Sequence, residues 1–311
     1  MRVTRAVSAV LALMLIAPTG AYAEPVGAAD PAAIVVVGSR ADQAKTAAEQ
    51  AKVITLRPSA DNPLPHHYAP ICVRLFGIDP AYGSLIANRI RWNIQTLGRP
   101  LGKAGCQPNV WIGFVSDSRN EVALLRKQEP AMFASLKNFE IDRIFGGSGA
   151  AQAWHATEVR SVDGRPIPTT ELDFGARKAE VKVNSQYSGG RLNSPIRSDI
   201  NGTIVIFDRG RANGRTVQQL ADYATLRILA PVQDFADDAP GTMPSILQLF
   251  TPGAVAPDGL TEFDWAYLSA YYKLDRGAKV SAIHDAAKQA MLDGTGAKLR
   301  EKAAVSEPTA P

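Results

Sequence analysis

Residues 71–115 read ICVRLFGIDPAYGSLIANRIRWNIQTLGRPLGKAGCQPNVWIGFV, and this stretch decides the fold. The apolar runs at 71–77 and 109–115 are typical of buried strands, and residues 81–97 between them are typical of a helix. One face of that helix carries Tyr82, Ile86, Ile90, Ile94 and Leu97. A strand, a helix and a second strand of these lengths predict a right-handed crossover between two parallel strands.

The two cysteines lie next to these strands, Cys72 in the first strand and Cys106 just before the second. Because neighbouring parallel strands would bring the two residues together, we expect a disulfide that closes a loop of about 34 residues. A metal or redox pair is the alternative, but the chain has no C-x-x-C motif and no histidine near either cysteine.

Downstream of this unit the chain alternates between β-prone pieces and helices. Residues 154–215 predict an irregular β region that contains an apolar strand at 203–208. Helices are expected at residues 117–127, 216–230, 261–274 and 278–292. The predicted fold class is therefore α/β or α+β, with a single main domain at residues 68–292 in which a mixed sheet is flanked by helices.

The first 23 residues have the features of a signal peptide. Arg2 and Arg5 precede an apolar core, and Ala21-Tyr22-Ala23 is a typical cleavage site. The chain is therefore expected to be exported, either to the periplasm or outside the cell.

Residues 24–67 and 293–311 are expected to lie outside the main domain. In the first segment, residues 41–52 are typical of a helix, and the prolines and the His66–His67 pair after them indicate an extended linker, so we expect a flexible arm followed by a Pro-rich linker. We expect the two histidines to be solvated, and fortuitous metal binding is the alternative. The last 19 residues predict a disordered tail.

Composition limits the classes of function. With 46% hydrophobic and 21% charged residues, the chain has a globular composition. Removal of the predicted signal leaves 32 basic and 30 acidic residues, which are dispersed, so no nucleic-acid partner is expected. No apolar run after residue 23 approaches the roughly 20 residues that span a bilayer, so the chain is not expected to be membrane-spanning.

Common catalytic motifs are missing from the sequence. The phosphate-binding loop, the G-x-S-x-G elbow and H-E-x-x-H do not occur, so we predict no metal and no cofactor. His155 and Glu158 come closest to H-x-x-E-H, but Val159 stands where the second histidine belongs. Asp222 interrupts an apolar helix and is either a paired structural carboxylate or a functional one. These three residues are the catalytic candidates, and a purely structural role is the alternative for each of them.

Polar residues before the apolar strand at 203–208 are candidates for ligand binding. Arg191, Arg197 and Asp199 lie there, and arginines beside a buried strand can hold a carboxylate or phosphate bidentately. The alternative is Arg–Asp pairing that stiffens a loop. Tyr223, next to Asp222, is a further candidate for ligand contact.

The order of the motifs resembles an exported protein family of alphaproteobacteria whose function is unknown. The matching motifs are Ile71-Cys72-Val73, Gly105-Cys106, Trp154-His155, Arg197-x-Asp199, Leu220-Ala221-Asp222-Tyr223 and Ser245-Ile246-Leu247-x-Leu249-Phe250. The resemblance covers residues 68–272 and implies export, but no activity.

Two fainter likenesses concern parts of the chain. The order of elements after the strand at 203–208 is similar to zincin-like secreted proteins, but the helix at 220–223 carries no zinc histidines, which implies a metal-free relative. Residues 34–40 resemble a β-prone segment near the mature N-terminus of TonB-dependent receptors, which implies partner binding by strand addition. An ordinary edge strand or a disordered arm is the alternative there.

From these features we expect a cell-envelope protein without enzymatic activity that binds an unknown envelope protein or a small ligand. A zincin-like hydrolase, or an inactive relative of one, is the alternative function. It would use His155, Glu158 and Asp222.

Overall fold

The computed structural model describes residues 38–57, 62–146, 149–173, 175, 178–184, 194–236, 239 and 241–305. The predicted signal peptide, residues 34–37 of the β-prone segment, and Arg191 lie outside these residues. Within the described part, no helix combines the length and apolar character needed to cross a bilayer.

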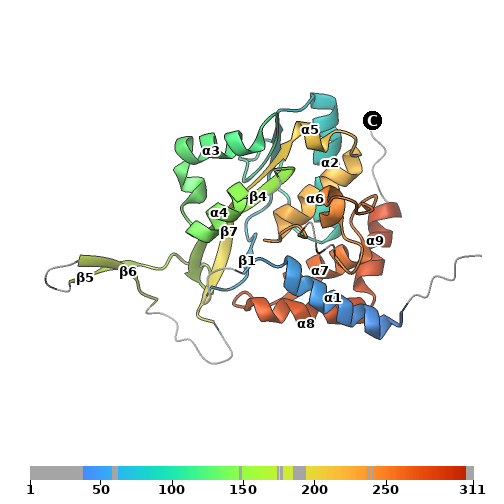
Figure 1. Cartoon of the computed structure of the whole chain (residues 1–311). Coiled ribbons are helices and arrows are strands. Elements are labelled where there is room, and N and C mark those ends of the chain that lie inside the picture. Colours follow the sequence, from blue (N-terminus) through green and yellow to red (C-terminus); the bar gives the residue numbers. More distant parts are fainter. Residues whose placement is uncertain are drawn as a thin grey trace, which may run out of the picture. The chain divides into compact units, whose positions relative to one another are not determined.

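A mixed five-stranded sheet forms the centre of the fold (Figure 1). Its strands are β1 (Pro65–His66), β2 (Val73–Phe76), β3 (Val110–Val115), β4 (Ala151–Ser161) and β7 (Ile196–Asp208). Strands β1 and β3 pair parallel with β7, and β2 pairs parallel with β3. Strand β4 runs antiparallel to β7 along its other side. The predicted mixed sheet with parallel strands is therefore confirmed, and β4 lies at its edge.

The predicted crossover is helix α2 (Pro80–Thr96), which connects β2 to β3. Asp79 caps its start, because the carboxylate accepts a hydrogen bond from the N–H of Ala81 at 2.9 Å. The predicted disulfide is also confirmed: Cys72 and Cys106 are bonded, with their Cα atoms 6.1 Å apart. The bridge joins the start of β2 to the loop before β3.

Helices cover both faces of the sheet because the side chains of β7 alternate between the two faces. Val205 and Phe207 belong to the core that includes α6 (Val217–Leu229) and α7 (Glu262–Lys273). Ile204 and Ile206 pack on the other side against a smaller cluster. That cluster receives side chains from α3 (Ser118–Gln128), the 3-10 turn η1 (Pro130–Phe133) and α4 (Asn138–Gly146).

The helix expected at residues 41–52 is confirmed, but the expectation that the described residues before residue 68 form a flexible arm is wrong. Helix α1 (Arg40–Ile54) packs against α8 (Val280–Leu292), and it has a stripe of buried alanines, including Ala44, Ala47 and Ala51. Alanines at this spacing let two helices approach closely although the segment has low overall hydrophobicity. Leu64 is also fully buried, so the main domain begins before Tyr68.

The expectation of a disordered tail is likewise wrong for residues 295–305. They form helix α9 (Thr295–Val305), which packs against α7 and buries Ala303. Gly296 makes the contact possible, because a Cβ atom there would lie 2.2 Å from the carbonyl oxygen of Glu262.

The predicted irregular β region consists of two different parts. Strands β4 and β7 are long strands of the main sheet, with a register shift beside Ala156 and Thr157. Strands β5 (Thr169–Asp173) and β6 (Lys178–Lys182) form a separate antiparallel pair. Further short elements are α5 (Arg209–Ala212) and η2 (Ile246–Phe250).

The disulfide is expected to contribute measurably to stability. Replacing Cys72 and Cys106 together with Ala should lower the free energy of unfolding by about 3–4 kcal/mol, because the bridged residues are 34 positions apart. Urea unfolding followed by circular dichroism measures the change. The wild-type protein under reducing conditions serves as the control and should match the double variant. An unchanged unfolding midpoint in both would contradict the prediction.

Candidate functional site

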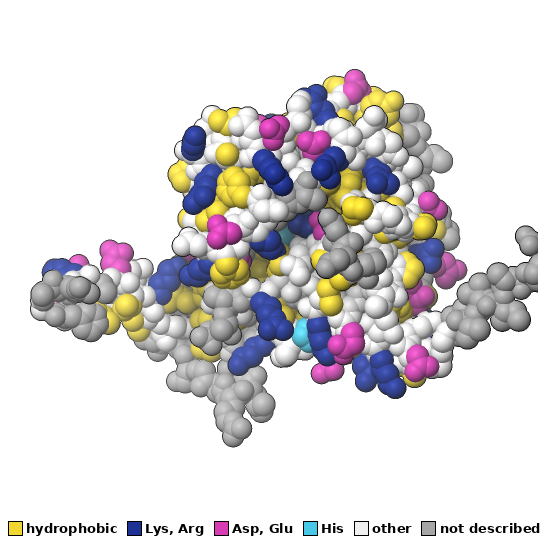
Figure 2. All heavy atoms as spheres, in the orientation of Figure 1, with side chains coloured by type: hydrophobic (Ala, Val, Ile, Leu, Met, Phe, Trp, Pro, Cys, Tyr) yellow, Lys and Arg dark blue, Asp and Glu magenta, His cyan; other side chains and the backbone are white. Residues whose placement is uncertain are grey.

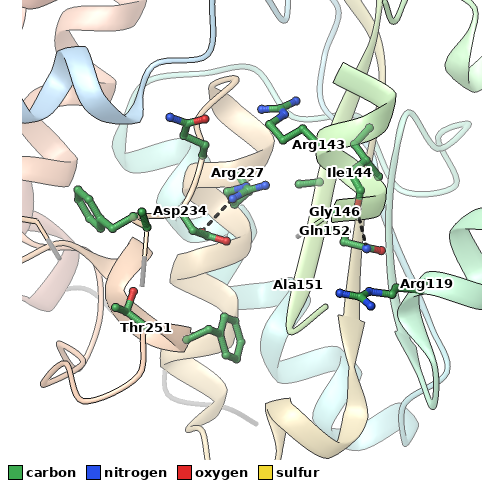
Figure 3. A pocket seen from close by; sticks show the side chains of 14 residues that line it. Arg119, Arg143, Ile144, Gly146, Ala151, Gln152, Arg227, Asp234 and Thr251 are labelled. Carbon is green, nitrogen blue, oxygen red and sulfur yellow. Dashed lines mark hydrogen bonds and ion pairs between the residues drawn. The ribbon is translucent and has the colours of Figure 1, made fainter. Parts of the chain in front are cut away.

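A cavity of about 420 Å³ lies beside the start of β4, between α4 and α6. Its polar lining is Arg119, Arg143, Gln152, Arg227 and Asp234, and we call it the arginine cavity. Figure 3 shows Arg227 and Asp234 on one side of it and Gln152 on the other. In the orientation of Figure 2, Lys and Arg side chains gather around a hollow near α4 and β4. Ala151 and Ala153 on β4 also line the cavity, and their small side chains leave it open.

Arg227, in the last turn of α6, is the most deeply buried cation of the cavity. Its Nη1 donates to Asp234 at 2.9 Å and to the Tyr223 hydroxyl at 3.3 Å. The Tyr223 hydroxyl in turn donates to both carboxylate oxygens of Asp234, at 2.8 and 2.9 Å. Burial raises the pKa of Tyr223 well above its usual value, so the hydroxyl stays a donor. Tyr223 therefore positions Asp234.

The Nε of Arg227 has no hydrogen-bond partner among the described residues, although the residue is only 6% exposed. The Oε1 of Gln152 is also buried without a partner there, while its Nε2 donates to the carbonyl oxygen of Ile144 at 2.8 Å. Buried polar groups are nearly always paired. A ligand with an acceptor for Arg227 and a donor for Gln152 would satisfy both.

Arg143 is a half-buried cation on α4. Burial, and next the positive charge of Arg227, lower the pKa of Arg143 to about 10. No ion pair joins Arg143 to a carboxylate of the described residues. With Arg119 from α3 the lining has three arginines and one aspartate. This excess of positive charge suits an anion.

A second cavity of about 430 Å³ continues along β4. Trp154, His155, Thr157 and Glu158 line it, and Arg143 lines both cavities. The two cavities therefore lie next to each other. The second cavity contains two of the predicted catalytic residues, His155 and Glu158.

His155 is a buried, hydrogen-bonded histidine. Its Nε2 donates to the carbonyl oxygen of Ile228 at 3.1 Å, and His67 donates to the same oxygen at 3.1 Å. Burial, with a contribution from His67, lowers the pKa of His155 to about 3. Burial lowers the pKa of His67 to about 4. Both imidazoles are therefore neutral near pH 7.

The expectation that His66 and His67 are solvated is wrong. His66 is 5% exposed and His67 is 1% exposed. The Nδ1 and Nε2 atoms of His66 lie 2.8 and 2.9 Å from the carbonyl oxygens of Leu64 and Tyr271, and the nitrogen that carries the proton donates to its carbonyl. Main-chain carbonyls from distant segments thus hold both histidines inside the domain, which a reading of the local proline pattern could not reveal.

The three catalytic candidates do not share a centre. Glu158 accepts hydrogen bonds from Arg160 at 2.7 Å and Asn201 at 3.1 Å. Asp222 lines neither cavity and is fully buried. It accepts two hydrogen bonds from Arg89 of α2, at 2.8 and 3.0 Å. The described residues also contain no cluster of three or more His, Cys, Asp or Glu that could hold a metal ion.

Arg197 and Asp199 form an ion pair with two hydrogen bonds. The guanidinium donates to both oxygens of the carboxylate, at 2.7 and 2.8 Å, and lies 3.9 Å from the centre of the Tyr68 ring. Neither residue lines one of the two cavities. The structure thus favours the alternative for this pair, which is Arg–Asp pairing.

No sequence motif marks the residues of the arginine cavity. Arg119, Arg143, Gln152, Arg227 and Asp234 come from separate segments and form no motif. The one available signal was an arginine inside the otherwise apolar stretch 226–229 of α6.

Acid should destabilise the protein through its buried histidines. Their folded-state pKa values lie below the unfolded value near 6.5, so the unfolded state binds protons first. The stability that the two neutral histidines contribute is fully present above about pH 6.5, and it is lost as the pH falls toward the folded-state pKa values of His67 and His155, about 4 and about 3. Asp264 has the opposite effect, because burial raises its pKa to about 6 and its contribution is lost as pH rises through that range.

Replacing His155 with Gln should therefore flatten the loss of stability between pH 6.5 and 4, measured by urea unfolding at several pH values. His284→Gln is the matched control, because His284 is less buried and should change the slope less. Asp264→Asn should steepen the same loss. An unaltered slope in the His155 variant would show that His155 does not titrate as described.

The Asp222 carboxylate is expected to be a major structural contact. Asp222→Ala should lower the free energy of unfolding by about 3–5 kcal/mol, because it removes one partner of a buried ion pair. Asp142→Ala is the control, since Asp142 is exposed on α4 and its loss should change stability by no more than about 0.5 kcal/mol. Equal effects of the two substitutions in urea unfolding would refute this role.

Comparison with known proteins adds no further identification of the site. No protein family model, no curated protein and no solved structure matches this chain.

Proposed function

We propose that this chain is an exported cell-envelope protein that binds an anionic ligand, a carboxylate or a phosphate, in the arginine cavity, without catalysing a reaction. The observation that carries the proposal is the pair of cations Arg143 and Arg227. The positive charge of Arg227 adds to the effect of burial in lowering the pKa of Arg143, and the buried Nε of Arg227 lacks a partner among the described residues.

Two costs act on Arg143 in the unliganded protein: it is partly removed from water, and the positive charge of Arg227 repels it, whereas Asp234 already stabilises Arg227. An anion would offset both costs. Guanidinium groups also present several N–H donors in a plane, which matches the oxygens of a carboxylate or phosphate. Residues that lower stability while they favour a ligand are typical of binding sites.

Export is supported by two independent features. Residues 1–23 have the charge, the apolar core and the cleavage site of a signal peptide. The Cys72–Cys106 disulfide is of a kind that persists in oxidising compartments such as the periplasm and the cell exterior. His155 and Asp222 take part in structural hydrogen bonds, which favours the structural alternative for these two catalytic candidates.

Titration with inorganic phosphate and with N-acetylalanine, followed by amide chemical shifts in NMR spectra, tests the proposal. Arg143→Gln should raise both dissociation constants about tenfold or more, because it removes a charge-assisted hydrogen bond of about 1.5–3 kcal/mol. The same substitution should leave the melting temperature of the unliganded protein unchanged or higher, because it removes a repulsion.

The matched control is Arg91→Gln on the exposed side of α2, which should change neither affinity nor melting temperature. Sodium chloride at equal ionic strength controls for general screening. Equal affinities of the wild-type protein and the Arg143 variant would rule out the arginine cavity as the anion site.

A further inference from the structure

Strand β4 pairs with β7 along one edge, and no described strand of the main sheet pairs with its other edge. Asp208 donates its main-chain N–H to the carbonyl oxygen of Ala150 at 3.0 Å, and Ala151 lies opposite Phe207. Bonded and non-bonded pairs alternate in an antiparallel ladder, so Ala151, Ala153 and His155 point their N–H and C=O groups away from β7.

The residues that carry these outward groups are largely buried, and the groups have no partner in the described part of the chain. Ala151 is 9% exposed, and Ala153 and His155 are each 7% exposed. No main-chain hydrogen bond joins their outward groups to another described segment. By contrast, the outward N–H of Thr157 donates to the Ser135 hydroxyl at 2.9 Å. Main-chain groups without a protein partner are rare at largely buried positions in folded proteins, so the gap at 151–155 offers hydrogen-bonding groups to a ligand.

Both cavities open onto this unpaired edge. Ala151 and Ala153 line the arginine cavity, and His155 lines the second cavity. The three residues span roughly 14 Å at about 3.4 Å per residue, which is the length of a short extended peptide. The hydrogen bond between Thr157 and Ser135 ends the free edge on the side of the second cavity.

The charges give the direction of such a peptide. The arginine cavity holds the Ala151 end of the edge, and its lining includes Arg119, Arg143 and Arg227 but only one carboxylate among the described residues, Asp234. A free carboxyl terminus placed at this end would complement the excess positive charge. The peptide would then run antiparallel to β4, with its preceding residues in the second cavity.

We propose that the two cavities form one groove that binds the carboxyl-terminal residues of an extended peptide as an additional strand on β4. The main chain of the peptide pairs with Ala151, Ala153 and His155, and its terminal carboxylate lies among the arginines. This inference rests on the proposed function, because it uses the same anion site and specifies the class of ligand.

The test uses the peptide acetyl-TVTVTA with a free carboxyl terminus, because alternating β-prone residues favour an extended strand. Its dissociation constant is measured by NMR titration of the full mature chain. We expect binding at least tenfold tighter than that of N-acetylalanine, which offers the carboxylate without the preceding main chain. The same peptide with a carboxyl-terminal amide should bind at least tenfold more weakly than the free acid.

Strand addition has a signature that simple anion binding lacks. Successive N–H groups of an added strand point alternately to β4 and away from it. N-methylation of one of two successive central residues of the peptide should therefore weaken binding at least tenfold, and N-methylation of its neighbour should not. Equal effects at both positions would overturn strand addition.

Hydrogen exchange reports on the edge directly. Binding of acetyl-TVTVTA should slow exchange of the Ala153 amide at least tenfold. The amide of Gln152, which faces β7, is the internal control and should change little. Exchange of Ala153 that is as slow as that of Gln152 in the free protein would overturn the proposal, because the edge would already be paired by another segment or a second copy.

The outcomes separate the inference from the proposed function. If N-acetylalanine binds and Arg143→Gln weakens it, but acetyl-TVTVTA binds no tighter, the peptide groove is wrong and the anion site stands. If the amide binds as well as the free acid, the terminal carboxylate is not what the arginines recognise and the inference fails. If Arg143→Gln changes the affinity of no probe, both proposals fail.

Discussion

The buried carboxylate of Asp222 fixes the helix on which the candidate site depends. It accepts hydrogen bonds from Arg89 and Asn93 of α2 and from the main-chain N–H of Leu260 before α7. Because three segments meet at one side chain, α6 cannot slide along α2 without breaking a buried ion pair. The last turn of α6 carries Arg227, so this contact sets where the deepest cation of the arginine cavity lies.

The parts of the fold predicted from sequence are those with a strong local period. The crossover from β2 to β3 was predicted because its apolar residues repeat at helix spacing between two apolar strands. The disulfide followed from that topology. The sequence predicts the helix of α1 but not its packing on the domain, and it does not predict α9, because alanine and glycine create close helix contacts without high hydrophobicity. Their packing becomes evident only once α7 and α8 are in place.

The candidate site was less predictable than the fold. His155 and Glu158 do line a cavity, but Asp222 belongs to the α2 contact and Arg197 pairs with Asp199. The arginine cavity is assembled from α3, α4, β4, α6 and the loop after it, so no spacing in the sequence marks it. Arginines that are scattered along the sequence without a motif can be recognised as one site only when the fold brings them together.

The two unusual features of the site have a common physical explanation. Polar main-chain groups at a buried strand edge and like charges in one cavity both destabilise a folded protein. Ala151 and Ala153 contribute to both features, because their main chain forms the unpaired edge and their small side chains leave room beside the arginines. The unpaired strand edge would be satisfied by main-chain amide groups of a ligand, and the like charges would be satisfied by an anionic group. The two features occur at adjoining positions on one strand, and a peptide carboxyl terminus carries both groups in the same arrangement.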